Sequence, residues 1–320
     1  MQKHLSPDLG FDLIRATEAA AASAGRWMGL GNPDEADQAA TQALLDALNK
    51  IDMDGSIVIG EEKPGYDPLL TKHLKVGNGK GSQVDIATDP VDGSLQLAMG
   101  HPGALSVVAV APAGSMWTPA PAIYMDKIVV NAEVAEALVP ECLDAPAAWT
   151  LALVARAKGK KVKNLTVFVL DRPRHVDLIE EIRAAGARVI LRPDGDIAGA
   201  LLSCVPDSDV DILMGIGGTL EGIIMACAVK ALGGGMLARL EPQSEAEQAA
   251  VQTAGIDRSS IFSCSELVSS NEVFFTATGI TEGPILSGIT YEGNHARSNS
   301  MILRGETKTR RIIHAEHLLE

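Results

Sequence analysis

The strongest constraint on the fold is an alternation of short apolar runs with longer amphipathic ones in the second half of the chain. Runs rich in Val, Ile, Leu and Met predict buried strands at 165–170, 188–191 and 210–214. Each run is followed by helical spacing, at 174–186, 196–204 and 219–232. This order is typical of an α/β layer, and it predicts a mostly parallel sheet.

The first half of the chain has its own strands and helices. The pattern predicts helices at 11–29 and 34–50 and strands at 56–60, 84–88 and 104–111. Strand character returns at 272–278, and the tail alternates as β-hairpins do, so we expect it to rejoin the first sheet. Residues 141–163, rich in Ala, Pro and Lys, predict a connection. The result is two α/β subdomains, 1–145 with 270–320, and 146–269.

Charge and composition exclude several classes of protein. The chain has 27 basic and 41 acidic side chains, a net charge of −14, which disfavours nucleic acid and anionic membranes as partners. No apolar run is long enough to span a bilayer, and the first residues lack a secretory signal pattern, so we expect a cytoplasmic protein. The four cysteines are widely spaced, which predicts buried reduced thiols rather than zinc ligands or disulfides.

The segment Asp89-Pro90-Val91-Asp92-Gly93-Ser94 is the most informative motif for chemistry. Pro90 biases the residue before it toward extended structure, so Asp89 should end a strand and Asp92 can turn back toward it. Gly93 permits a tight turn, and Ser94 offers a hydroxyl where a helix could begin. Paired carboxylates of this type suit a hard divalent cation beside a phosphate.

Other acidic residues lie at the ends of predicted elements. Asp37 is in the first turn of a helix, Glu61 and Glu62 end a strand, and Glu221 opens the helix after Gly215-Ile216-Gly217-Gly218. Taken alone, Asp37 and Glu221 are better explained by helix capping, and Glu61 and Glu62 could be a solvated strand end. If they converge with Asp89 and Asp92, their mutual repulsion requires cations between them, which implies Mg²⁺ or Mn²⁺.

Three further segments could bind an anion or a sugar. Arg172-Pro173-Arg174-His175 joins a strand to a helix and could clamp a phosphate, although a solvated basic turn is about as plausible. Asp194-Gly195-Asp196 could accept sugar hydroxyls or simply cap a helix. The Gly215–Gly218 turn could present backbone N–H groups to an anion, but it lacks the rest of a P-loop. Tyr124 is ambiguous between core packing and a ligand contact.

Taken in order, these segments resemble class II fructose-1,6-bisphosphatases over nearly the whole chain, and more distantly the lithium-sensitive, metal-dependent sugar and inositol phosphatases. The matching segments are Arg26–Gly29, Ala36-Asp37, Ile57–Glu61, Val84–Ala87, Asp89–Ser94, Tyr124–Lys127, Arg172–His175, Pro193–Asp196, Gly215–Gly222 and Thr276–Thr281. The resemblance implies a layered αβαβα sugar-phosphatase fold. It implies hydrolysis of the 1-phosphate of fructose 1,6-bisphosphate in a homo-oligomer, dimer or tetramer, with roles in gluconeogenesis or carbon fixation.

The resemblance also implies roles for individual residues. The implied metal ligands are Asp37, Glu61, Asp89, Asp92 and Glu221. Ser94, Asp89 and Asp92 would be catalytic. The implied substrate contacts are Asp92, Gly93, Ser94, Tyr124, Arg172, Pro173, Arg174, Asp194, Gly195, Asp196 and Gly218. The ions would be Mg²⁺ or Mn²⁺.

The chain departs from the family pattern at a few positions. Asp92 stands where Glu is common, and Ser94 stands where Thr is usual. Glu62 follows Glu61 where the family commonly has Gly, so the choice of metal ligand between them is open. Residues 30–35 lack the basic residues that often precede the metal-binding Asp.

Alternative functions stay open on the sequence. A sedoheptulose-1,7-bisphosphatase, alone or with dual activity, would use the same residues. An inositol monophosphatase would not need the arginines for a second phosphate. A non-catalytic sugar-phosphate-binding regulator would gain little from the complete set of carboxylates and Ser94.

Overall fold

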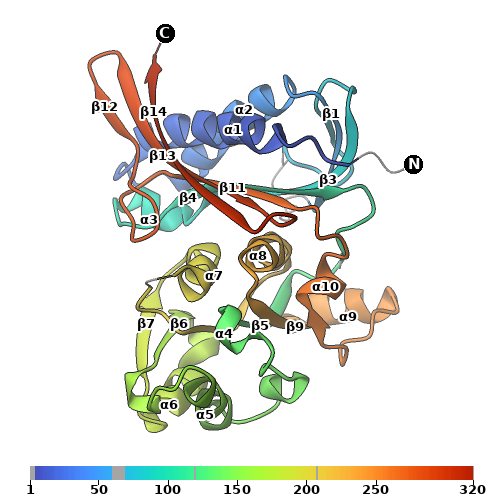
Figure 1. The fold of residues 1–320 in the computed structure, drawn as a ribbon, viewed down its shortest axis with the longest axis vertical. Coiled ribbons are helices and arrows are strands. Elements are labelled where there is room, and N and C mark those ends of the chain that lie inside the picture. Colours follow the sequence, from blue (N-terminus) through green and yellow to red (C-terminus); the bar gives the residue numbers. More distant parts are fainter. Residues whose placement is uncertain (1–3, 60–68, 119, 207, 320) are drawn as a thin grey trace. The chain divides into compact units, whose positions relative to one another are not determined.

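The computed structural model describes residues 4–59, 69–118, 120–206 and 208–319. The chain divides into two compact units, residues 1–116 with 270–320, and residues 117–269. Figure 1 shows the elements of each unit. The predicted α/β class is confirmed, because each unit combines a sheet with helices that cover it. No helix in the described ranges has the length and apolar character that a membrane span requires.

The first unit contains helices α1 (Leu9–Ala24), η1 (Gly25–Trp27), α2 (Pro33–Leu48) and α3 (Ser94–Ala98). Its strands are β1 (Met53–Ile59), β2 (Lys75–Val76), β3 (Ser82–Asp92), β4 (Leu105–Pro112), β11 (Phe274–Gly279), β12 (Thr290–Glu292), β13 (His295–Arg304) and β14 (Thr309–Leu318). Among the described residues they form an eight-stranded sheet in the order β12-β13-β11-β4-β3-β1-β2, with β14 paired to β13. The predicted return of the tail to this sheet is confirmed, because β13 pairs with β11 and β11 pairs with β4.

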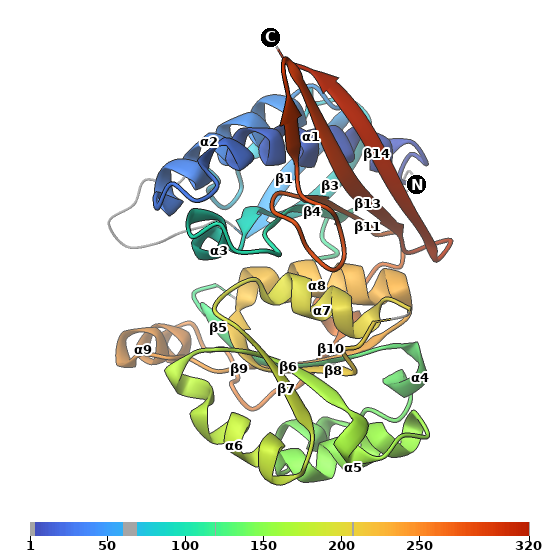
Figure 2. The ribbon, with the colours of Figure 1, turned by 90° about the vertical axis from the view of Figure 1, so that its left-hand side faces the viewer.

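The core of the first unit lies between the sheet and the pair α1 and α2, which lie together over one face (Figure 2). Leu13 and Leu44 from the helices meet Ile57 and Ile86 from the strands, and all four are fully buried. Leu13 and Leu44 belong to sets of apolar residues at helical spacing, and Ile57 and Ile86 face inward from their strands. This packing fixes β3, the strand that carries the Asp89 motif.

The second unit has six strands within its described part, in the order β10-β9-β5-β8-β6-β7. They are β5 (Tyr124–Val130), β6 (Thr166–Leu170), β7 (Arg188–Arg192), β8 (Ile212–Gly218), β9 (Gly235–Leu240) and β10 (Phe262–Ser263). The longer helices are α5 (Ala147–Ala157), α6 (Val176–Ala184), α7 (Asp196–Cys204), α8 (Thr219–Leu232) and α9 (Glu245–Thr253). The short ones are α4 (Ala132–Ala135), η2 (Pro140–Leu143), η3 (Val162–Asn164), η4 (Pro173–His175) and α10 (Cys264–Leu267).

Helices cover both faces of this second sheet. Figures 1 and 2 show α7 and α8 on one face and α5 and α6 on the other. Because successive side chains of a strand point to opposite faces, residues of β5 alternate between these two environments. All four cysteines of the chain are buried, as the sequence predicted.

Two structural predictions are wrong. The second sheet is mixed, because β5 lies between β8 and β9 and is antiparallel to both, while only the β6–β7 and β6–β8 pairs are parallel. The helical crossovers account for the parallel part, but the position of β5 is set by tertiary pairing. The supposed connection at 141–163 contains helix α5, whose Leu151 and Val154 are fully buried in the core of the unit.

Candidate active site

The Asp89 motif forms a bulge at the end of β3. Asp89 is opposite Val107 of β4 and Asp92 is opposite Leu105, so three steps on β3 face two on β4. Such a bulge re-aims side chains at the end of a strand. Pro90 led us to expect that the strand would end at Asp89. The strand instead continues to Asp92. Both carboxylates are buried, and Asp89 Oδ1 accepts a hydrogen bond from the Val91 N–H at 2.9 Å.

Gly93 turns the chain from this bulge into helix α3. Its φ of 94° lies in the left-handed region, which favours glycine. A β-carbon at this position would also lie 2.6 Å from Gln96 Oε1. Ser94 then opens α3, as predicted, so its hydroxyl and backbone N–H directly follow the two carboxylates.

Asp37 belongs to the same unit, on helix α2, which contacts both β3 and α3. Within the described residues, no three His, Cys, Asp or Glu side chains come together in a group that could hold a metal ion. Glu61 and the alternative Glu62 lie outside those residues. The carboxylates of Asp37, Asp89 and Asp92 offer only oxygen donors, and these fit a hard cation such as Mg²⁺ or Mn²⁺ rather than a thiophilic one.

In the second unit, a buried ion pair lies among the predicted substrate residues. Lys127 of β5 is fully buried, and its Nζ donates to Asp196 Oδ2 at 2.7 Å and to the Gly218 carbonyl at 3.1 Å. Asp196 is the first residue of α7, after Gly195, whose φ is 79°. Lys127 was not among the predicted site residues. The sequence signal that could have identified it is a lysine directly before the apolar run Ile128-Val129-Val130.

The three glycines of Gly215-Ile216-Gly217-Gly218 make room for three charged or polar side chains. A β-carbon at Gly215 would lie 2.9 Å from His175 Nε2, and its φ of 119° also favours glycine. A β-carbon at Gly217 would overlap the Asp196 carboxylate. One at Gly218 would overlap the carboxylate of Glu221, the third residue of α8. From the sequence, these glycines were predicted only as possible backbone donors to an anion.

We expect Gly218→Ala to impair activity much more than stability. Gly218 has φ −69° and ψ 153°, which any residue adopts, and the three atoms nearest to an added β-carbon all belong to the flexible Glu221 side chain. That side chain can rotate away, but its carboxylate then leaves its place. Since the family resemblance implies that Glu221 is a metal ligand, phosphate release should fall by about 10²-fold, a loss typical of removing one positioned group from a catalytic site. Assays of phosphate release beside thermal unfolding check this, and an inactive variant that is also unfolded would contradict it.

Arg174, one of the two arginines predicted to bind a phosphate, is held in place by β8 and by Tyr124. Its Nε and Nη2 donate to the Ile216 carbonyl at 3.1 and 2.9 Å, and its guanidinium lies 5.2 Å from the centre of the Tyr124 ring. Arg172 Nη2 is 3.7 Å from Asp194 Oδ1. Burial lowers the pKa of Arg174, and the nearby Arg172 lowers it further. A bound phosphate would relieve this repulsion between two cations.

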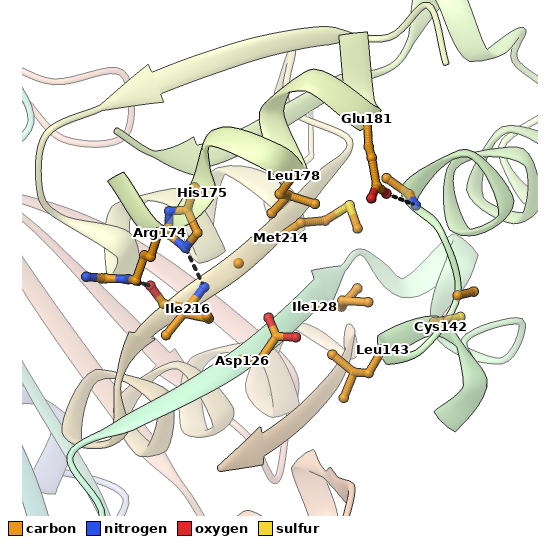
Figure 3. A pocket seen from close by; sticks show the side chains of 13 residues that line it. Asp126, Ile128, Cys142, Leu143, Arg174, His175, Leu178, Glu181, Met214 and Ile216 are labelled. Carbon is orange, nitrogen blue, oxygen red and sulfur yellow. Dashed lines mark hydrogen bonds between the residues drawn. The ribbon is translucent and has the colours of Figure 1, made fainter. Parts of the chain in front are cut away.

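His175 links the segment Arg172–His175 to β8 through a neutral imidazole ring. Its Nδ1 lies 2.7 Å from the Leu170 carbonyl, and its Nε2 lies 2.7 Å from the Ile216 backbone nitrogen. A carbonyl only accepts and an N–H only donates, so the proton is on Nδ1. Burial lowers the pKa of His175, which favours this neutral form. The ring is therefore a buried structural link, as Figure 3 shows, and not a surface group or a general base.

A cavity of about 170 Å³ opens beside this link, on the face of the second sheet that carries α6 (Figure 3). Asp126 lines it, and burial raises the pKa of that carboxyl to about 6, against an opposing effect of Arg239. Asp126 and Lys127 are neighbours in β5, so the cavity and the Lys127–Asp196 pair lie on opposite faces of one strand.

The mixed α/β architecture with two helix-covered sheets is that of the α/β sugar-phosphatase class. Comparison with known proteins narrows this class. A family described as "Bacterial fructose-1,6-bisphosphatase, glpX-encoded" matches residues 7–317. The "Fructose-1,6-bisphosphatase class 2" of Haemophilus influenzae is 41% identical over 325 aligned positions, covering 98% of this chain and 96% of the relative. The "Fructose-1,6-bisphosphatase 1 class 2" of Escherichia coli K12 is 39% identical over 326 positions, with the same coverage. The chain belongs to the glpX-encoded fructose-1,6-bisphosphatase family.

Proposed function

We propose that this protein hydrolyses the 1-phosphate of fructose 1,6-bisphosphate to give fructose 6-phosphate and inorganic phosphate. The observation that carries the proposal is the match to class 2 fructose-1,6-bisphosphatases over 98% of the chain. The buried pair Asp89 and Asp92, which directly precedes Ser94, supports a phosphate monoester as substrate. In the reaction, a water oxygen bonds to phosphorus as the bond from phosphorus to the sugar O1 breaks, and the leaving alkoxide takes a proton.

The family is metal-dependent, and we propose Mg²⁺ or Mn²⁺ as the ion. Its ligands would be Asp37, Glu61, Asp89, Asp92 and Glu221, with Glu62 as the alternative to Glu61. A divalent ion bound there would supply Lewis-acid stabilisation of charge at the phosphoryl group. Ser94 would orient the attacking water and help to remove its proton. The backbone N–H groups that follow Gly93 would donate to the phosphate oxygens.

The second unit would hold the rest of the substrate. Arg172 and Arg174 would bind the 6-phosphate, and the two bonds from Arg174 to Ile216 use two of its five N–H donors. Asp194 and Asp196 would accept sugar hydroxyls, Asp196 while it also accepts from Lys127. Pro173, Gly195, Tyr124 and Gly218 would complete the contacts. Remote binding of this kind orients the reacting phosphate.

The test is phosphate release by the purified protein. Fructose 1,6-bisphosphate, sedoheptulose 1,7-bisphosphate and an inositol monophosphate would each be assayed with Mg²⁺ and with Mn²⁺. We expect release from the first, with little from the inositol ester, which lacks a second phosphate for the arginines. A strong preference for the seven-carbon sugar would assign the alternative bisphosphatase activity. Binding without release would support a regulator.

We also propose a cytoplasmic location and a homo-oligomer, either a dimer or a tetramer. In this scheme residues 1–145 with 270–320 are the metal- and phosphate-binding subdomain, and residues 146–269 are the substrate-binding subdomain. The proposed location rests on the sequence pattern and the proposed assembly on the family resemblance. Sedimentation analysis of the purified protein measures the assembly.

A further inference from the structure

Glu247 of helix α9 is a buried carboxylate bonded to the segment that carries Tyr124. Its Oε1 accepts from the Ile123 and Tyr124 N–H groups at 2.7 and 2.9 Å, and its Oε2 accepts from the Gln243 N–H at 2.9 Å. Its side chain crosses from α9 to the start of β5, 123 residues away in the chain. By its sequence, the pattern Ser244-x-x-Glu247 would suggest an ordinary helix cap.

With these bonds, the backbone N–H and carbonyl groups of Ile123 and Tyr124, at the start of β5, all have hydrogen-bond partners. The Tyr124 carbonyl accepts from the Glu241 N–H at 3.0 Å, and the Ile123 carbonyl accepts from the Thr219 N–H at 2.8 Å. Glu247 satisfies the two N–H groups of the same dipeptide. The backbone at Tyr124 is thereby held from α9 as well as from its neighbours in the sheet. A short tether of this kind restricts where the Tyr124 ring can lie.

The Tyr124 ring is in turn a platform for Arg174, whose guanidinium lies 5.2 Å from its centre. A cation over an aromatic face is attracted by the ring and is held in one orientation. We propose that Glu247 is a positioning residue, which acts through Tyr124 to hold Arg174 for the distal phosphate of the sugar bisphosphate. This inference rests on the proposed function, and it assigns Glu247 to substrate binding rather than to bond cleavage.

A carboxylate suits this position better than any other side chain of its size. Three N–H groups point at its two oxygens, and an ionised carboxylate only accepts. Glutamine has the same shape, but its neutral oxygen is a weaker acceptor than a carboxylate oxygen, and its NH₂ group would face either the Gln243 N–H or both N–H groups of Ile123 and Tyr124. Glu247→Gln should therefore weaken the tether without leaving a cavity.

The experiment compares Glu247→Gln with Glu245→Gln, an exposed position on the same helix. We expect Glu247→Gln to raise KM for fructose 1,6-bisphosphate about tenfold and to leave kcat within about twofold, the pattern of a lost binding interaction. Glu245→Gln should leave both constants unchanged. Thermal unfolding of each variant checks that the fold is kept. A fall in kcat with unchanged KM, or no change at all, would overturn the inference.

A double variant tests whether the effect passes through Tyr124. Tyr124→Leu removes the ring that Arg174 overlies, and the tether should then matter little. We expect Glu247→Gln to raise KM by less than about twofold in the Tyr124→Leu background. A full tenfold increase in that background would show a general structural role and refute the proposal. If the wild-type protein released no phosphate from any bisphosphate, the proposed function would fail and the inference with it. If the wild type were active but Glu247→Gln had no effect on KM, only the inference would fail.

Discussion

Asp89→Asn should abolish metal-dependent phosphate release while the protein stays folded. Asparagine keeps a side-chain oxygen in place, so the hydrogen bond from the Val91 N–H at 2.9 Å can persist and the bulge is retained. What disappears is the negative charge that the proposed cation needs. Removal of a single positioned charge costs about 10²–10³ in kcat, and loss of a direct ligand should cost at least as much.

The matched control is Asp46→Asn, the same change at an exposed position of α2 in the same unit. Both variants would be assayed for phosphate release over a range of Mn²⁺ and Mg²⁺ concentrations, with circular dichroism to follow folding. The control should retain full activity. If Asp89→Asn also remained active at every metal concentration, the assignment of the reaction centre to the Asp89 motif would be wrong.

Lys127→Met should produce the largest loss of stability of any single substitution considered. It leaves the buried Asp196 carboxylate without the cation that lies 2.7 Å from it. Breaking a buried pair from one side costs about 3–5 kcal/mol in the free energy of unfolding. Urea titration followed by tryptophan fluorescence measures this change.

Two further variants show whether the unpaired charge is the cause. Lys127→Met with Asp196→Leu removes both charges, and it should recover most of the lost stability because a buried pair is replaced by apolar groups. Lys75→Met breaks the exposed pair with Asp54 and should have little effect, since solvent screens that pair. If the double variant were as unstable as the single one, packing around the lysine stem would be the cause instead. The double variant should also bind substrate poorly, since Asp196 is a proposed sugar contact.

Periodicity predicted many of the elements but not how they pair. The predicted helices at 196–204 and 219–232 coincide with α7 and α8, because their apolar spacing is regular over the whole length. The direction of the second sheet was predicted wrongly, because β5 inserts between β8 and β9 from an earlier part of the chain. Helix α5 was missed because proline and lysine residues around it resemble those of a linker.

The sequence by itself determined the family and the order of its motifs, because both are linear patterns that need no knowledge of contacts. It also identified Asp89, Asp92, Ser94 and Arg174 as candidates, since their chemistry is visible in their local spacing. Only the tertiary structure decided which side chains meet. Lys127 reaches Asp196 across 69 residues, and Glu247 reaches Tyr124 across 123. A hydrogen bond or ion pair needs atoms within about 3 Å of each other, and that distance depends on sheet pairing and register, which periodicity does not encode.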